Sequence, residues 1–392
     1  MNRPWRSARV GASGFPGQSG DPVGFAATPS AQPSNWNAGS WPGAYPGSLT
    51  AWPGGTGSQT ISDGTNATSG AGTAGNPWVF AFYDFNCSTT GTITVTVAHA
   101  RFVGCRFQSN NGGPVVSSGV TILFNAGSSD LIFSYCSVVP LISKWTSPPN
   151  GAWPSAGAGQ GIVPASAAYT NTGGYCIPAN DAYQFAFAFN APSGTITIDH
   201  CDIWGFGNAI GWATGVSTQS NVTDCWIHDA ANCNVTASGQ STNFHTDGPG
   251  YLNGSTAPSN ILIQHCTIAT IGNTNAMAWQ LVTSAYNNIT MINNFLSGFG
   301  DNCSLSTLTT GNDTMTNTTF TDNVFGTDNP WIFGPLHNNY STMFSGGGNL
   351  WKRNKLLVLA GTSPNGGSSP AWTNADDGKF LLPDSTLSTT DF

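Results

Sequence analysis

Apolar and polar residues alternate along much of the chain, in a pattern that recurs from Phe102 to Leu356. Each copy has a central Cys or Asn, one apolar residue three positions before this centre and another two positions after it. The stretch 196–203, with the sequence ITIDHCDI around Cys201, shows the pattern most clearly. Alternation with a period of two residues is typical of β-strands that bury one face.

Eight windows fit the pattern without a mismatch. Their centres are Cys105, Cys136, Cys201, Cys225, Cys266, Asn294, Asn323 and Asn354. The apolar residues three before are Phe102, Phe133, Ile198, Val222, Ile263, Met291, Phe320 and Trp351, and those two after are Phe107, Val138, Ile203, Ile227, Ile268, Leu296, Phe325 and Leu356. The separation of neighbouring centres varies from 24 residues, between Cys201 and Cys225, to 65 residues, between Cys136 and Cys201.

Strands that repeat at this spacing, with no helical pattern between them, predict an all-β solenoid over residues 76–358: a right-handed, single-stranded parallel β-helix. One coil cannot bury its own apolar face, so each neighbour covers it and the core becomes a continuous column. Each fully buried Ile, Phe or Val is expected to contribute roughly 1.5–3 kcal/mol. The central cysteines would form a ladder of buried free thiols, because parallel side chains have poor geometry for a disulfide bond.

The two ends of the chain lack the pattern. Residues 1–75 are rich in Gly, Pro, Ser and Thr, with Trp5, Trp36, Trp41 and Trp52 between them, so we predict an extended anchoring segment that lies against the β-helix or a partner protein. The long interval between Cys136 and Cys201 is expected to hold a large side loop and a hidden coil. Residues 359–392 are predicted to form a cap or a contact arm.

Composition excludes several classes of partner. The chain has 392 residues, only 7% of them charged, and a net charge of −8, which leaves no basic surface for nucleic acid. It has no apolar run of about 18 residues and no apolar signal segment, so we expect a soluble protein without membrane insertion or a cleaved export signal. With 49 Gly and 24 Pro, and no Glu, helix is expected to be minor.

Alignment on the centres places Asn208, Asp247, Asn275 and Asp301 in one column, on successive coils. One interpretation is structural, because Asn and Asp side chains hydrogen-bond their own backbone in turns. The other is catalytic. Asp247 and Asp301 would lie two coils apart, about 9–10 Å, and inverting glycoside hydrolases separate their two carboxyl groups by about 6.5–9.5 Å.

In the catalytic interpretation Asp247 and Asp301 are acid and base and His245 lies nearby. The residues on adjacent coils that would line an acidic groove are Asp199, Asp224, His228 and Asp229. A lyase is disfavoured, since no Lys or Arg stands between Lys144 and Lys352 to serve as the base.

We predict no metal and no cofactor. Asp199, Asp202, Asp224 and Asp229 could hold Ca²⁺, but aspartate is common in turns. His200 and His265 are expected to alternate outward beside the cysteine ladder, and the His spacing of zinc sites is missing.

Four stretches carry a resemblance to a known family: GASGFPG at 11–17, DHCDIWGFGNAI at 199–210, HTDGPGYLN at 245–253 and TDNVFGT at 321–327. They resemble the β-helix minor tail proteins of phages of actinobacteria, which have pectate-lyase-like relatives. The polygalacturonases are a further similar group, but their paired aspartates and their Gly-His-Gly and Arg-Ile-Lys motifs are missing here.

The resemblance implies a virion protein at the phage tail tip or baseplate. It would bind other tail proteins through its N-terminal segment and contact a host cell-envelope glycan, and by analogy with viral spikes it would be a homotrimer. Two hypotheses follow. The favoured one is a structural protein without enzymatic activity, and the alternative is a glycan-cleaving hydrolase.

Overall fold

The computed structural model describes residues 49–87, 92–109, 120–140, 185–204, 206, 208–213, 215–228, 247–251, 256–270, 275–280, 285–298, 301–306, 314–325, 334–336 and 347–356. Within these residues all regular secondary structure is β-strand. None of them belongs to a helix with the length and apolar character needed to cross a membrane.

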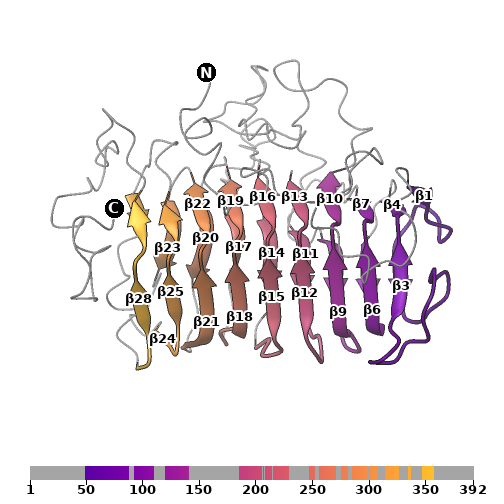
Figure 1. The fold of residues 1–392 in the computed structure, drawn as a ribbon, viewed down its shortest axis with the longest axis horizontal. Helices are drawn as coiled ribbons and strands as arrows, with labels where there is room; N and C mark the ends of the chain where they lie inside the picture. Colours follow the sequence, from indigo (N-terminus) through magenta and orange to yellow (C-terminus); the bar gives the residue numbers. More distant parts are fainter. Residues whose placement is uncertain are drawn as a thin grey trace, which may run out of the picture.

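The strands form three sheets, and each turn of the chain adds one strand to sheet C, then to sheet A, then to sheet B (Figure 1). Sheet A contains β1 (Thr50–Ala51), β4 (Tyr83–Cys87), β7 (Arg106–Ser109), β10 (Ser137–Pro140), β13 (Asp202–Trp204), β16 (Trp226–His228), β19 (Thr267–Thr270), β22 (Phe295–Gly298), β26 (Val324–Phe325) and β29 (Lys355–Leu356).

Sheet B contains β2 (Gln59–Ile61), β5 (Ile93–Val95), β8 (Val120–Phe124), β11 (Phe185–Phe189), β14 (Asn208–Trp212), β17 (Asp247–Tyr251), β20 (Asn275–Gln280), β23 (Asp301–Ser306) and β27 (Gly334–Leu336). Sheet C contains β3 (Trp78–Ala81), β6 (Ala98–Val103), β9 (Ser129–Ser134), β12 (Ile196–Asp199), β15 (Ser220–Thr223), β18 (Ser259–Gln264), β21 (Tyr286–Ile292), β25 (Thr319–Thr321) and β28 (Leu350–Lys352), with β24 (Met315–Thr316) beside β21.

All pairings between these strands are parallel, and their register follows the predicted centres. Ile198, for example, pairs with Phe133 on one side and with Val222 on the other. The predicted parallel β-helix is therefore confirmed, while its right-handed sense stays a prediction. Ten stacked strands in sheet A give a column about 43 Å long at about 4.8 Å per step.

The interval between Cys136 and Cys201 contains a single coil. Strand β9 pairs directly with β12, and β10 pairs directly with β13, so no strand lies between them. The expectation of a hidden coil was wrong for this reason. Residues 141–184 connect β10 to β11 and lie outside the described residues.

The β-helix begins earlier than residue 76. β1 pairs with β4 and β2 pairs with β5, so these two strands belong to a coil that precedes the one formed by β3, β4 and β5. Trp52 stacks on Phe85 with ring centroids 4.5 Å apart. By register with Phe107, both rings occupy the position two residues after the centre of their own coil. Residues 49–75 thus contain a coil within the predicted anchoring segment, whereas 1–48 and the predicted arm 359–392 lie outside the described residues.

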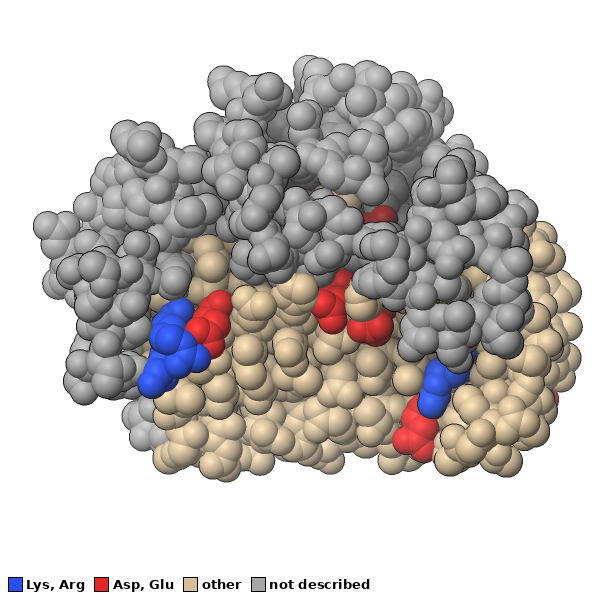
Figure 2. Space-filling model, viewed as in Figure 1, with Lys and Arg blue, Asp and Glu red and all other residues tan. Residues whose placement is uncertain are grey.

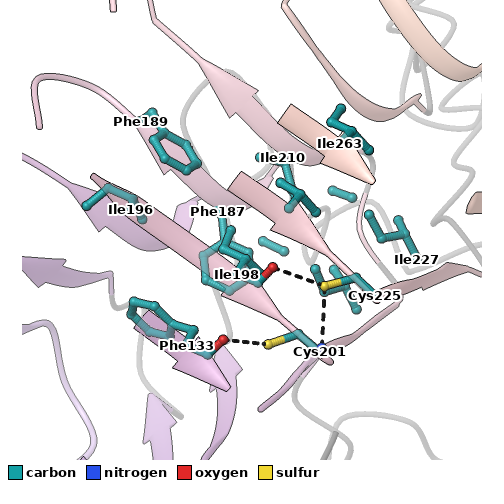
Figure 3. Close-up of a cluster of buried hydrophobic side chains, with 14 of the residues drawn as sticks. Phe133, Phe187, Phe189, Ile196, Ile198, Cys201, Ile210, Cys225, Ile227 and Ile263 are labelled. Carbon is teal, nitrogen blue, oxygen red and sulfur yellow. Dashed lines mark hydrogen bonds between the residues drawn. The ribbon is translucent and has the colours of Figure 1, made fainter. Parts of the chain in front are cut away.

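The core is the predicted apolar column. The apolar residues on either side of the centres are buried wherever their exposure is described, and Phe80, Phe102 and Phe133 stack with centroids 4.9 and 4.4 Å apart. Figure 3 shows the middle of this column, where Ile198 and Ile210 point toward one another beside Cys201 and Cys225. Burial of stacked aliphatic and aromatic side chains is the main favourable contribution to folding here.

The eight centres form one continuous hydrogen-bond ladder, and all are fully buried. Each side chain donates to the carbonyl oxygen of the residue three before the centre in the preceding coil: the Cys225 Sγ donates to Ile198 at 3.4 Å, and the Asn294 Nδ2 to Ile263 at 2.9 Å. From Cys225 to Asn354 each side chain also accepts the backbone N–H of the preceding centre, as the Asn294 Oδ1 does from Cys266 at 2.9 Å. Thiol and amide therefore perform the same task.

The described cysteines of the ladder are free thiols, as predicted. Burial raises the pKa of the Cys136 and Cys225 thiols well above the usual value, so they stay protonated and can donate.

The residue before each of the eight centres adopts a left-handed conformation, with φ between 50° and 59°. These residues are Gly104, Tyr135, His200, Asp224, His265, Asn293, Asp322 and Arg353. In all but the last coil, the backbone N–H of this residue donates to a carbonyl of the next coil. The turn between sheets C and A is thereby repeated with the same two positions, the centre and the residue before it. We use the name turn row for the outward-facing residues at this turn, including the last residue of the sheet C strand, such as Asp199.

The ladder makes Asn294 a test of what holds the coils together. Asn294→Ala removes the buried hydrogen bonds that this side chain makes to the Ile263 carbonyl and from the Cys266 N–H, and each such loss costs about 1–3 kcal/mol. We expect the free energy of unfolding to fall by about 3 kcal/mol, measured by denaturant titration. Asn294→Cys is the matched control and should lose less, since cysteine occupies this position in five coils. Equal losses for the two variants would contradict the equivalence of thiol and amide.

Candidate functional site

The predicted column of Asn and Asp residues exists at the start of four strands of sheet B. Asn208 pairs with Asp247, Asp247 with Asn275, and Asn275 with Asp301. Asp247 and Asp301 are therefore two coils apart, about 9–10 Å along the stack. Both the catalytic and the structural interpretation predict this register, so the register alone does not distinguish them.

Asn208 is the member of this column whose surroundings are described. It is 4% exposed, and its Oδ1 is buried without a hydrogen-bond partner. A buried, unsatisfied amide oxygen costs about 1–3 kcal/mol. This end of the column is therefore buried rather than open to solvent.

The other residues predicted for the groove that the structure describes lie away from sheet B. Asp199 and Asp224 lie at the turn between sheets C and A, and His228 is the last residue of β16, in register with Trp204 and Ala269 of sheet A. His245 and Asp229 lie outside the described residues. The structure thus separates the described candidates into a column on sheet B, a second group at the turn, and His228 on sheet A.

That second group is a cluster of His and Asp side chains in the turn row. The Asp199 Oδ2 lies 2.9 Å from the His200 Nδ1, and the Thr223 hydroxyl donates to the Asp199 Oδ1 at 2.6 Å. Between the next two coils, the Asp224 carboxylate is hydrogen-bonded to the His265 Nδ1. Each of these imidazoles and carboxylates is partly buried, with side-chain exposures between 18% and 30%.

The electrostatics of the cluster follow from these contacts. Burial by itself lowers the pKa of His200, but the hydrogen bond and the negative charge of Asp199 outweigh it, so the pKa is raised overall. Tyr135 stacks on His200 with ring centroids 4.8 Å apart. Burial and the charges of Asp199 and Asp224 raise the pKa of Tyr135 to about 12, so its phenol stays protonated.

Sequence reasoning found only half of this cluster. It named Asp199 and Asp224, but it treated His200 and His265 as outward residues without a role. The signal that could have found them is their position, because both directly precede a centre and must fall in one row when the centres are aligned.

Charges elsewhere on the described surface are few and mostly paired. Arg106 makes a bidentate contact with Asp84, at 3.0 and 2.6 Å, and Arg353 makes one with Asp322, at 2.6 and 2.5 Å. Figure 2 shows basic and acidic groups side by side toward the two ends of this face, and acidic groups nearer its middle. Such exposed pairs contribute at most about 1 kcal/mol each.

Comparisons with known proteins found a structural similarity but no match in sequence. No family model matches the chain, and no curated protein matches it. Among solved structures the chain is similar to a pectin methylesterase from Yersinia enterocolitica, with 11% sequence identity and a TM-score of 0.38. This similarity covers 83% of the present chain and 99% of the other.

The column on sheet B makes a prediction about folding. Asp247→Asn should leave the thermal unfolding temperature unchanged within about 2 °C, because Asn occupies the equivalent register at 208 and 275. Differential scanning calorimetry measures this. Asp247→Leu is the matched control and should unfold at a lower temperature. A large loss for Asp247→Asn would contradict the interpretation of the column as one of interchangeable Asn and Asp.

Proposed function

We propose that this chain is a structural protein of a phage tail, a rigid β-helix at the tail tip or baseplate that contacts the host cell surface. The observation that carries the proposal is the uninterrupted ladder, which joins eight consecutive coils through buried hydrogen bonds from Cys105 to Asn354. A column held in this way transmits force along its axis without relying on loops. Rigidity of this kind suits a particle that must survive outside a cell.

A resemblance in sequence also supports the proposal. The stretches at 11–17, 199–210, 245–253 and 321–327 resemble minor tail proteins of phages of actinobacteria. A surface on which Arg106 and Arg353 are already paired also suits contact with other subunits. In this proposal the N-terminal residues bind neighbouring tail proteins, the β-helix touches a host-envelope glycan, and three copies associate.

A second candidate function rests on one specific observation, the register of Asp247 and Asp301. Their separation of about 9–10 Å along the stack is close to the carboxyl spacing of inverting glycoside hydrolases. In this alternative one carboxyl group protonates the leaving oxygen and the other activates water. Asn275 would lie between them in the same column.

The structural proposal predicts where the chain is found. Virions purified from a culture that produces this chain should contain it in a fixed copy number, and antibodies against its coils should label the tail tip in electron micrographs. A version that lacks residues 1–48 should keep its coils, because the described strands begin at Thr50, but should no longer enter particles. Normal incorporation of the truncated chain would contradict the anchoring role.

The enzymatic alternative predicts release of reducing sugar from host-envelope polysaccharide. Asp247→Asn and Asp301→Asn should each lower this activity by at least 10²-fold, since general acid or base catalysis contributes about that much. Asp322→Asn is the matched control, because Asp322 lies at the turn between sheets C and A rather than on sheet B, pairs there with Arg353, and should not affect the rate. An inactive wild-type chain would rule out the hydrolase on that substrate and leave the structural proposal intact.

A further inference from the structure

The turn row carries metal-ligating side chains on three consecutive coils. Asp199 and His200 precede Cys201, Asp224 precedes Cys225 and His265 precedes Cys266. One donor atom each from Asp199, His200 and Asp224 lie within 4.8 Å of one another. His265 is joined to this group through the Asp224 carboxylate.

We propose that Asp199, His200 and Asp224 bind one divalent first-row transition cation, such as Zn²⁺. Imidazole nitrogen together with carboxylate oxygen is a donor set that suits Zn²⁺ and its neighbours, whereas Ca²⁺ and Mg²⁺ favour oxygen donors alone. Bonds of about 2.0–2.2 Å in a tetrahedron place donors about 3.4 Å apart. Small side-chain rotations therefore bring the three donors from their present spacing onto one ion.

The backbone holds these ligands in place before any ion binds. The N–H of His200 donates to the Thr223 carbonyl at 3.0 Å, and the N–H of Asp224 donates to the Gln264 carbonyl at 3.1 Å. The ladder fixes the residue that follows each of them. Ligand positions set by a repeated turn reduce the entropy lost on binding.

A further contact orients one of the ligands. The Thr223 hydroxyl donates to the Asp199 Oδ1, and the other oxygen of the same carboxylate faces the His200 ring. Hydrogen bonds of this kind commonly fix the carboxylates that bind metals. Thr223 therefore acts as a positioning residue.

The same side chains also pair with one another in the absence of a metal, so the competing explanation is an ion-pair network. The chain offers an internal comparison for this. His99 lies 3.1 Å from the Asp130 Oδ2, and both have positive φ values. Among the described residues this pair has no third ligand close enough to complete a group of three. It should not bind a transition cation, which makes it the matched control.

Binding would connect two neighbouring coils at the outside of the turn, and His265 of the next coil is hydrogen-bonded to the Asp224 ligand. Because an ion that binds only the folded chain stabilises it, Zn²⁺ should raise the unfolding temperature in proportion to the logarithm of its concentration above the dissociation constant. The site has no part in the proposed attachment to a host or in the proposed hydrolysis. Failure of either function would leave this inference standing.

The test uses the full chain and two probes. Titration calorimetry with Zn²⁺ should give about one ion per chain with a micromolar or tighter dissociation constant, and Co²⁺ should produce visible absorption bands typical of four-coordinate nitrogen and oxygen ligands. His200→Asn and Asp224→Asn should each weaken binding at least tenfold. Asn and Asp tolerate the left-handed conformation, so both variants should fold, which circular dichroism checks.

His99→Asn provides the control and should bind Zn²⁺ as the wild type does. Thr223→Val should weaken binding by a smaller factor than the ligand variants, since it removes only the orienting hydrogen bond. The inference is overturned if the wild type binds no Zn²⁺ at millimolar concentration. It is also overturned if folded His200→Asn and Asp224→Asn variants bind as tightly as the wild type.

Discussion

The structure depends on the hydrogen bond between each centre and the coil before it. A Cys or Asn side chain in the turn between sheets C and A donates to a buried carbonyl three positions before the preceding centre. Buried backbone groups that lack partners are costly, so every coil needs a donor at this position. Cys and Asn are small enough to fit and can both donate. This explains why two chemically different residues, Cys in the first five of these coils and Asn in the last three, occupy one position while the column beside them stays apolar.

The ladder also determines what happens outside the core. The turn has the same two positions in each of these coils. The residue before the centre therefore lies at the same edge of the β-helix in every coil, about 4.8 Å from the equivalent residue of the neighbouring coil. Polar residues that are 24 or 41 positions apart in the chain thus become adjacent, as His200, Asp224 and His265 do. The chemistry of the turn row follows from the stacking rather than from any local motif.

Much of this could be predicted from the sequence, because the apolar pattern repeats with period two and the centres fix its phase. The burial of the eight centres and the column from Asn208 to Asp301 both follow from that alignment. The first two coils lack this signal, since Thr50 and Tyr83 occupy their central positions instead of Cys or Asn. The cluster around His200 was missed because the contacts between side chains of neighbouring coils depend on rotamers, and the pattern of apolar residues does not specify these.

The connections between sheets explain where function can vary in such a fold. Those from sheet C to sheet A are short and constrained by the ladder, whereas those from sheet A to sheet B range from residues 299–300 to residues 141–184. Closing a longer loop costs only about 0.6 kcal/mol for each doubling of its length, so insertions at this edge are tolerated as long as the ladder stays intact. Surface contacts with a partner or a host can therefore change at the A-to-B edge while the column persists. A site in the turn row, by contrast, must keep its geometry for as long as the coils stack.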